Sequence, residues 1–149
     1  SKKALGYAIV DEILQGWVYA MWGGSDESDD PITTYQNALR NTFASMTPDD
    51  LSKGCPVNNL VQEMAGLDEG FQTRLNAIYT QWKDATESAL KQGQDSGKIR
   101  TDINAEAVSL FIISSIQGLI GIGKCAQSCD PGLQPVVEEL CNYMETLRA

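Results

Sequence analysis

The chain has 149 residues, a length typical of a single domain, and its apolar fraction of 42% is too high for an intrinsically disordered protein. It carries 20 acidic but only 11 basic side chains, without a basic cluster, so by itself it is unsuited to binding nucleic acid or an anionic membrane surface. Histidine, the commonest general base and metal ligand, does not occur. We therefore expect one non-enzymatic domain over residues 1–149, without a metal or another cofactor.

Helical periodicity runs through nearly the whole sequence, and no segment shows the sustained alternation of a β-strand. The first helix is expected at residues 3–22, and Gly23 and Gly24 then lead into an acidic loop. Its apolar residues fall mainly on one face, which is predicted to contact the core: Leu5, Ala8, Ile9, Ile13, Gly16, Trp17, Ala20 and Met21. A second group widens that face at the side: Tyr7, Val10, Leu14 and Val18.

Further helices are expected along the rest of the chain. Asp30 and Pro31 are typical of a helix start, so the second helix should cover residues 31–46. A loop is expected from Thr47 to Cys55, and Pro56 then begins a short helix that ends near Gly66. Three longer helices are predicted over residues 68–96, 104–129 and 131–147. The predicted fold class is therefore all-α, with six helices.

The helix expected at 104–129 is apolar on nearly every side, because the run from Leu110 to Ile113 points in four directions. It could be the central helix of one domain, a helix shared by two copies of the chain, or a membrane span. The uncharged run over residues 107–123 is shorter than the roughly 20 residues that a span requires, and it contains Ser114, Ser115 and Gln117. We expect a helix shared between two copies, and no membrane insertion.

Several motifs together resemble the regulatory part of TetR-family transcriptional repressors. The most extended is the stretch Gly54-Cys55-Pro56-Val57-Asn58-Asn59-Leu60-Val61-Gln62-Glu63-Met64. Residues further along agree in order and spacing: Phe71, Trp82, Leu90, Gly97-Lys98-Ile99, Ala107 and Gln117-Gly118. The opening Ser1-Lys2-Lys3-Ala4-Leu5 resembles the junction at which this family leaves its DNA-reading domain.

The resemblance implies a C-terminal effector-binding and dimerisation domain of a cytoplasmic repressor, from which the N-terminal helix-turn-helix domain is missing. It implies that operator DNA is contacted only through that missing domain, and that a bound effector causes operator release. It also implies a homodimer, in which the last two long helices of each copy form a four-helix bundle. The residues expected at that interface are Phe111, Ser114, Gly118, Gly121, Val137, Leu140 and Met144.

Large apolar side chains from several helices suit a cavity for a small, neutral and apolar effector. The residues expected to line it are Trp17, Met21, Tyr35, Val61, Met64, Tyr79, Trp82, Phe111 and Ser115. Each of the aromatic residues among them could equally be an ordinary part of the core.

Two other functions stay open. One is a helical protein-interaction adaptor without a ligand, and the other is a thiol-based redox sensor that uses Cys55, Cys125 or Cys129. A helix N-terminus such as that expected after Cys55 lowers the pKa of a thiol. Cys125 and Cys129 share a helical face, but two thiols alone make an incomplete metal site. No phosphate-binding glycine loop and no nucleophile elbow occurs, so catalysis is not expected.

Overall fold

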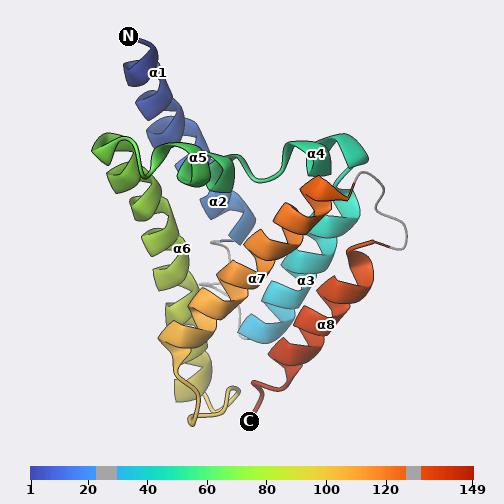
Figure 1. The fold of residues 1–149 in the computed structure, drawn as a ribbon. Coiled ribbons are helices and arrows are strands. Elements are labelled where there is room, and N and C mark those ends of the chain that lie inside the picture. The colour runs from blue at the N-terminus through green and yellow to red at the C-terminus, as the bar shows by residue number, and fades with distance from the viewer. Residues whose placement is uncertain (23–29, 127–131) are drawn as a thin grey trace.

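Helices account for most of the computed structural model, which describes residues 1–22, 30–126 and 132–149 (Figure 1). In chain order they are α1 (Lys2–Ile9), the π-helical segment η1 (Val10–Leu14), α2 (Gln15–Trp22), α3 (Pro31–Ser45), α4 (Pro48–Lys53), α5 (Pro56–Met64), α6 (Glu69–Asp95), α7 (Ala105–Cys125) and α8 (Gln134–Glu145). No β-strand occurs over these residues, although Ile99 and Arg148 form an isolated bridge. The predicted all-α class is confirmed.

Helix α4 lies where a loop was predicted, and its start explains the difference. Thr47 and Asp50 form a capping box, in which each side chain bonds the backbone N–H of the other residue. Pro48 occupies the first turn, and Gly54 ends the helix with a φ of 70°. The predictions for Gly23, Gly24 and Cys129 lie outside the described residues, as does the start of the helix predicted over residues 131–147.

The first helix buries a different face from the one predicted. Val10, Leu14, Val18 and Trp22 are buried, whereas Leu5 and Ile13 are exposed. A stripe of residues spaced by four drifts around a regular helix of 3.6 residues per turn. The wider π-helical turn at Val10–Leu14 reduces this drift, so the second apolar group of the sequence becomes the core face.

Helix α7 crosses the domain and packs against α6, α4 and α8, while α3 lies beside α8 (Figure 1). The buried residues of α7 are Ala105, Val108, Ser109, Ile112, Ile113, Ile116, Leu119, Ile120 and Gly123. By length and composition alone this helix could cross a membrane, but 44% of its most apolar window is already buried inside the domain. Its central position in the domain therefore explains part of its apolar character.

The N-terminal half of the first helix is held to the start of α6 by polar contacts. Asp68 caps α6 by accepting a hydrogen bond from the Phe71 N–H at 3.1 Å. The same carboxylate accepts a 2.5 Å hydrogen bond from the Tyr7 hydroxyl and pairs with Lys3 at 2.6 Å. The Lys3 ammonium and the Tyr7 hydroxyl hold the pKa of Asp68 well below its usual range. Arg74 of α6 adds an ion pair with Asp11 at 2.9 Å.

A buried hydrogen bond joins α3 to α6. The Tyr35 hydroxyl donates to Thr86 Oγ1 at 2.8 Å, and Thr86 Oγ1 donates to the Trp82 carbonyl at 2.9 Å. Tyr35 and Thr86 are both buried, so water cannot replace the bond between them.

Replacing Thr86 with valine keeps the shape of the side chain but removes the hydroxyl that bonds Tyr35. We expect Thr86→Val to lower the free energy of unfolding by about 1–3 kcal/mol, because the buried Tyr35 hydroxyl loses this hydrogen bond. Urea unfolding followed by far-UV circular dichroism measures the loss. Thr73→Val is the matched control, since Thr73 is exposed on the same helix and also bonds a carbonyl of the preceding turn. Equal effects of the two substitutions would contradict the structural role given to Thr86.

Candidate binding cavity

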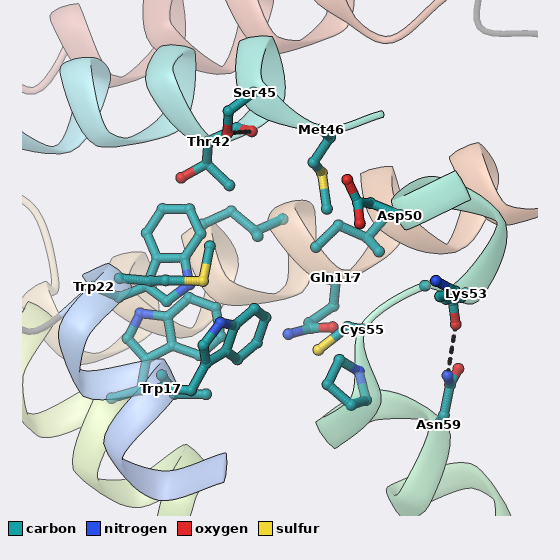
Figure 2. A pocket seen from close by; sticks show the side chains of 17 residues that line it. Trp17, Trp22, Thr42, Ser45, Met46, Asp50, Lys53, Cys55, Asn59 and Gln117 are labelled. Atoms are coloured by element: carbon teal, nitrogen blue, oxygen red, sulfur yellow. Dashed lines mark hydrogen bonds between the residues drawn. The ribbon is translucent and has the colours of Figure 1, made fainter. Parts of the chain in front are cut away.

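A cavity of about 600 Å³ lies between α2, the end of α3, α6, α7 and the segment that carries α4 and the start of α5 (Figure 2). Its volume is within the range of small-molecule sites in proteins. The apolar part of its lining comes from helices that are far apart in the sequence: Trp17, Val18, Met21, Trp22, Met46, Pro56, Trp82, Ile116 and Ile120. The polar part consists of Thr42, Ser45, Asp50, Lys53, Asn59 and Gln117, together with the Cys55 thiol and the Gly54 backbone.

Stacked aromatic rings form one side of the cavity. The rings of Trp22 and Trp82 are 5.3 Å apart between centroids and inclined by 18°. Tyr79 stacks on Trp82 from outside the lining, with centroids 6.4 Å apart and an interplanar angle of 13°. Burial raises the pKa of Tyr79 to about 12, so its hydroxyl stays neutral at physiological pH. This side can therefore offer flat, uncharged surface to a ligand.

The two charged residues of the lining lie together on one side of the cavity and already have partners (Figure 2). Lys53 pairs with Asp49, and Asp50 accepts hydrogen bonds from the backbone and hydroxyl of Thr47. These Thr47 bonds hold the pKa of Asp50 below its usual range. Because Asp50 and Lys53 are exposed to solvent, their charges are screened and the enclosed part of the cavity is neutral.

Three of the predicted ligand-binding residues line this cavity: Trp17, Met21 and Trp82. The others lie outside its lining. Tyr35 is buried in the core against Thr86, and Tyr79 lies behind Trp82. Val61 and Met64 pack against the core from α5, and the Ser115 hydroxyl bonds the Phe111 carbonyl.

Phe111 lies on the outer side of α7, where it is 51% exposed and packs edge-on against Tyr143 of α8. It therefore lies outside the cavity, and its place in a dimer interface stays a prediction.

Sequence reasoning did not assign Trp22, Cys55 and Gln117 to the cavity. Trp22 lies on the face of the first helix that the π-helical turn directs inward. Cys55 was singled out for its position before Pro56, which does make it the N-cap residue of α5. For Gln117, a long polar side chain between the apolar residues Ile116 and Leu119 was the available signal.

The residues predicted for the dimer interface separate into two groups. Ser114 and Gly118 are exposed with Phe111 on α7, and a Cβ at Gly118 or Gly121 would meet no described atom within 4 Å. Val137, Leu140 and Met144 of α8, by contrast, are buried within the domain. Because these three side chains already contact their own chain, they are not available to a second copy, and that part of the prediction is corrected.

The described cysteines are free thiols in different surroundings. Cys55 is buried on the cavity lining, and Cys125 is exposed at the end of α7. Cys141 is fully buried, and burial raises the pKa of its thiol. Among the described residues no group of three His, Cys, Asp or Glu side chains could hold a metal ion.

Comparison with known proteins decides which family this fold represents. Residues 33–131 match the family model described as "Tetracyclin repressor-like, C-terminal domain". The chain belongs to the TetR family. It is thus a regulatory domain of a family of transcriptional regulators, as the sequence motifs predicted.

Three curated relatives are transcriptional regulators by name. The chain is 27% identical to the HTH-type transcriptional repressor DhaR of Mycobacterium sp. (strain GP1) over 88% of this chain and 65% of DhaR. It is 26% identical to the transcriptional regulator AcuR of Cereibacter sphaeroides over 71% of this chain and 48% of AcuR. An uncharacterized HTH-type regulator of Lactococcus lactis is 28% identical over 54% of this chain and 41% of its own length. The chain therefore spans less than two thirds of the length of each of these relatives. No solved structure matches it.

The reactivity of the cysteine thiols tests whether Cys55 lies on an accessible cavity. With iodoacetamide, we expect Cys125 to react fastest, Cys55 more slowly and Cys141 slowest. The exposure of the three residues falls in that order, and the raised pKa of Cys141 reduces its thiolate fraction. Mass-spectrometric mapping of alkylated peptides measures the three rates separately, and mapping after urea unfolding is the control for intrinsic reactivity. A Cys55 as slow as Cys141 would contradict its position on an accessible cavity.

Proposed function

We propose that this TetR-family domain binds a small, apolar effector in the cavity and that binding causes release of operator DNA. The observation that carries the proposal is the cavity itself, a largely apolar space of about 600 Å³ whose lining includes three tryptophans. Such a space suits an apolar ligand, because a charged one would lose its hydration without gaining a counter-charge. Operator contact would belong to a DNA-reading domain outside this chain, and two of the relatives carry the description HTH-type.

The first helix is the element that connects the cavity to such a domain in this proposal. Trp17, Met21 and Trp22 of α2 line the cavity, and the same helix continues through η1 into α1. A ligand that contacts α2 favours one position of this helix if it binds that position more tightly than another. In a dimer, a shift of the first helix would change the separation of two DNA-reading domains, and operator spacing tolerates little change.

The proposed effector site predicts binding of N-phenyl-1-naphthylamine, a neutral apolar fluorophore. We expect this probe to quench tryptophan emission and to raise the melting temperature, because a ligand of the native state stabilises it. Replacing Trp17, which lines the cavity, should weaken binding about tenfold. Tyr19→Ala is the matched control, since Tyr19 is an exposed aromatic residue of the same helix outside the cavity lining. Absence of binding, or equal weakening by Trp17→Ala and Tyr19→Ala, would contradict the proposed site.

We also propose that the domain forms a homodimer through the outer sides of α7 and α8. Leu110, Phe111 and Ile122 of α7 and Val136 of α8 are about half or more exposed in the single chain. An apolar patch on a helix pair is typical of a protein–protein interface. The open sides of Gly118 and Gly121 would let a helix of the second copy approach closely.

Phe111→Glu is expected to separate this dimer into folded monomers, because symmetry places like charges close together in the interface. Sedimentation velocity measures the oligomeric state, and far-UV circular dichroism shows whether the helices are kept. Leu67→Glu is the control, because Leu67 is 82% exposed on the turn between α5 and α6, away from the proposed interface. A monomeric wild-type chain, or a Phe111→Glu variant that stays dimeric, would refute the proposed interface.

A thiol-based response is a second candidate function, and the position of Cys55 favours it. Cys55 lines the cavity directly before the nine-residue helix α5, so a reactive molecule that enters the cavity can meet its thiol. In either case we propose a cytoplasmic regulator without catalytic activity, as is expected for a protein that controls transcription.

A further inference from the structure

Gln117 of α7 lies on the border between the cavity and the outer side of this helix. Its side chain belongs to the cavity lining, and Figure 2 shows the amide nitrogen directed toward the tryptophan rings. On the surface of a helix, residues three and four positions apart are neighbours, and those of Gln117 include Ser114 and Gly121. Ser114 is exposed, and a Cβ at Gly121 would meet no described atom within 4 Å. The side of Gln117 that faces these two residues is therefore uncovered in the single chain.

The charge pattern of α7 suits a second copy of the same chain on this uncovered side. No charged residue occurs from Ala107 to Gly123, although the whole chain has a net charge of −9. A twofold contact brings the same surface of both copies together, so two acidic chains can meet at this segment without like-charge repulsion. Open space at Gly118 and Gly121 lets the backbone of the second copy come close to Gln117.

We propose that the second copy completes the effector site at Gln117, so that effector binding and dimerisation strengthen each other. The Gln117 amide oxygen has no hydrogen-bond partner among the described residues, so no bond to this oxygen fixes the side chain in the single chain. Contact with the second copy restricts the side chain before the effector arrives, and the effector then loses less conformational entropy on binding. Thermodynamic linkage requires the reverse effect too: an effector that fixes Gln117 favours the dimer. This inference rests on the proposed effector site and the proposed homodimer.

The affinity for N-phenyl-1-naphthylamine, compared between monomer and dimer, tests this linkage. Sedimentation velocity first identifies chain concentrations at which the protein is monomeric or dimeric, and tryptophan quenching then measures the dissociation constant of the probe at each. We expect this constant to be about threefold to tenfold lower for the dimer, the effect of fixing one long side chain in advance. Saturating probe should strengthen dimerisation by about the square of that factor, because each dimer holds two sites.

Gly118→Leu supplies a monomer where the wild-type dimer does not dissociate. Gly118 is outside the cavity lining and its Cβ would project into open space, so the added side chain leaves the fold and the cavity unchanged but blocks the approach of a second copy. We expect a folded monomer that binds the probe with the weaker affinity at every concentration. Gly66→Leu is the matched control, because a Cβ at Gly66 also meets open space but lies on the turn between α5 and α6. It should keep both the dimer and the tighter affinity.

Circular dichroism establishes that each variant is folded, and if Gly118→Leu unfolds or stays dimeric, Phe111→Glu supplies the monomer instead. Equal probe affinity of monomer and dimer, or a weaker affinity of the dimer, would overturn the inference and leave the effector site and the dimer intact. A wild-type chain that is monomeric at every concentration, with and without the probe, would overturn the proposed dimer and this inference with it. Failure of the probe to bind either form would overturn the proposed effector site and, again, this inference.

Discussion

The apolar surface of α7 is the constraint from which the arrangement of the domain follows. A helix with isoleucine, leucine and phenylalanine around most of its circumference must be covered on several sides. Its inner residues, such as Ile112 and Ile113, pack within the core that α6 and α8 share with it. Ile116, Gln117 and Ile120 contribute to the cavity instead, and Phe111 and Ile122 stay on the outer surface. One helix thus contributes to the core, to the proposed effector site and to the proposed interface.

Much of the fold could be predicted because helix ends and apolar periods are local properties of a sequence. Asp30, Asp68 and Asn104 are the N-cap residues of α3, α6 and α7 in the structure, and Pro31 and Pro56 are the first residues of α3 and α5. The short helix α4 was missed because its signal is a capping box without an apolar period, and six residues are too few to show one. The buried face of the first helix was wrong because a π-helical turn changes the period that the prediction assumed.

The cavity was harder to predict than the fold, for a physical reason. Periodicity indicates which side chains face inward, but it does not tell where inward-facing side chains fail to fill the space between helices. Trp17, Met21 and Trp82 were found because they are large and apolar, whereas Tyr35 and Tyr79, chosen by the same rule, are packed in the core. On α8, periodicity identified the apolar side that carries Val137, Leu140 and Met144. It could not tell whether a second copy or the same chain covers this side, and in the structure the same chain covers it.

The π-helical segment has a consequence for how the sequence of this domain can vary. A π-helical turn holds one more residue than the α-helical turn it replaces, and it absorbs that residue locally. A chain that lost one residue between Val10 and Leu14 could therefore return to an unbroken α-helix, while α1 kept its contacts with α6 and α2 kept its side of the cavity. The first helix can thus lose one residue within Val10–Leu14. A deletion before or after this segment would instead rotate the tryptophans out of the cavity or Tyr7 away from Asp68.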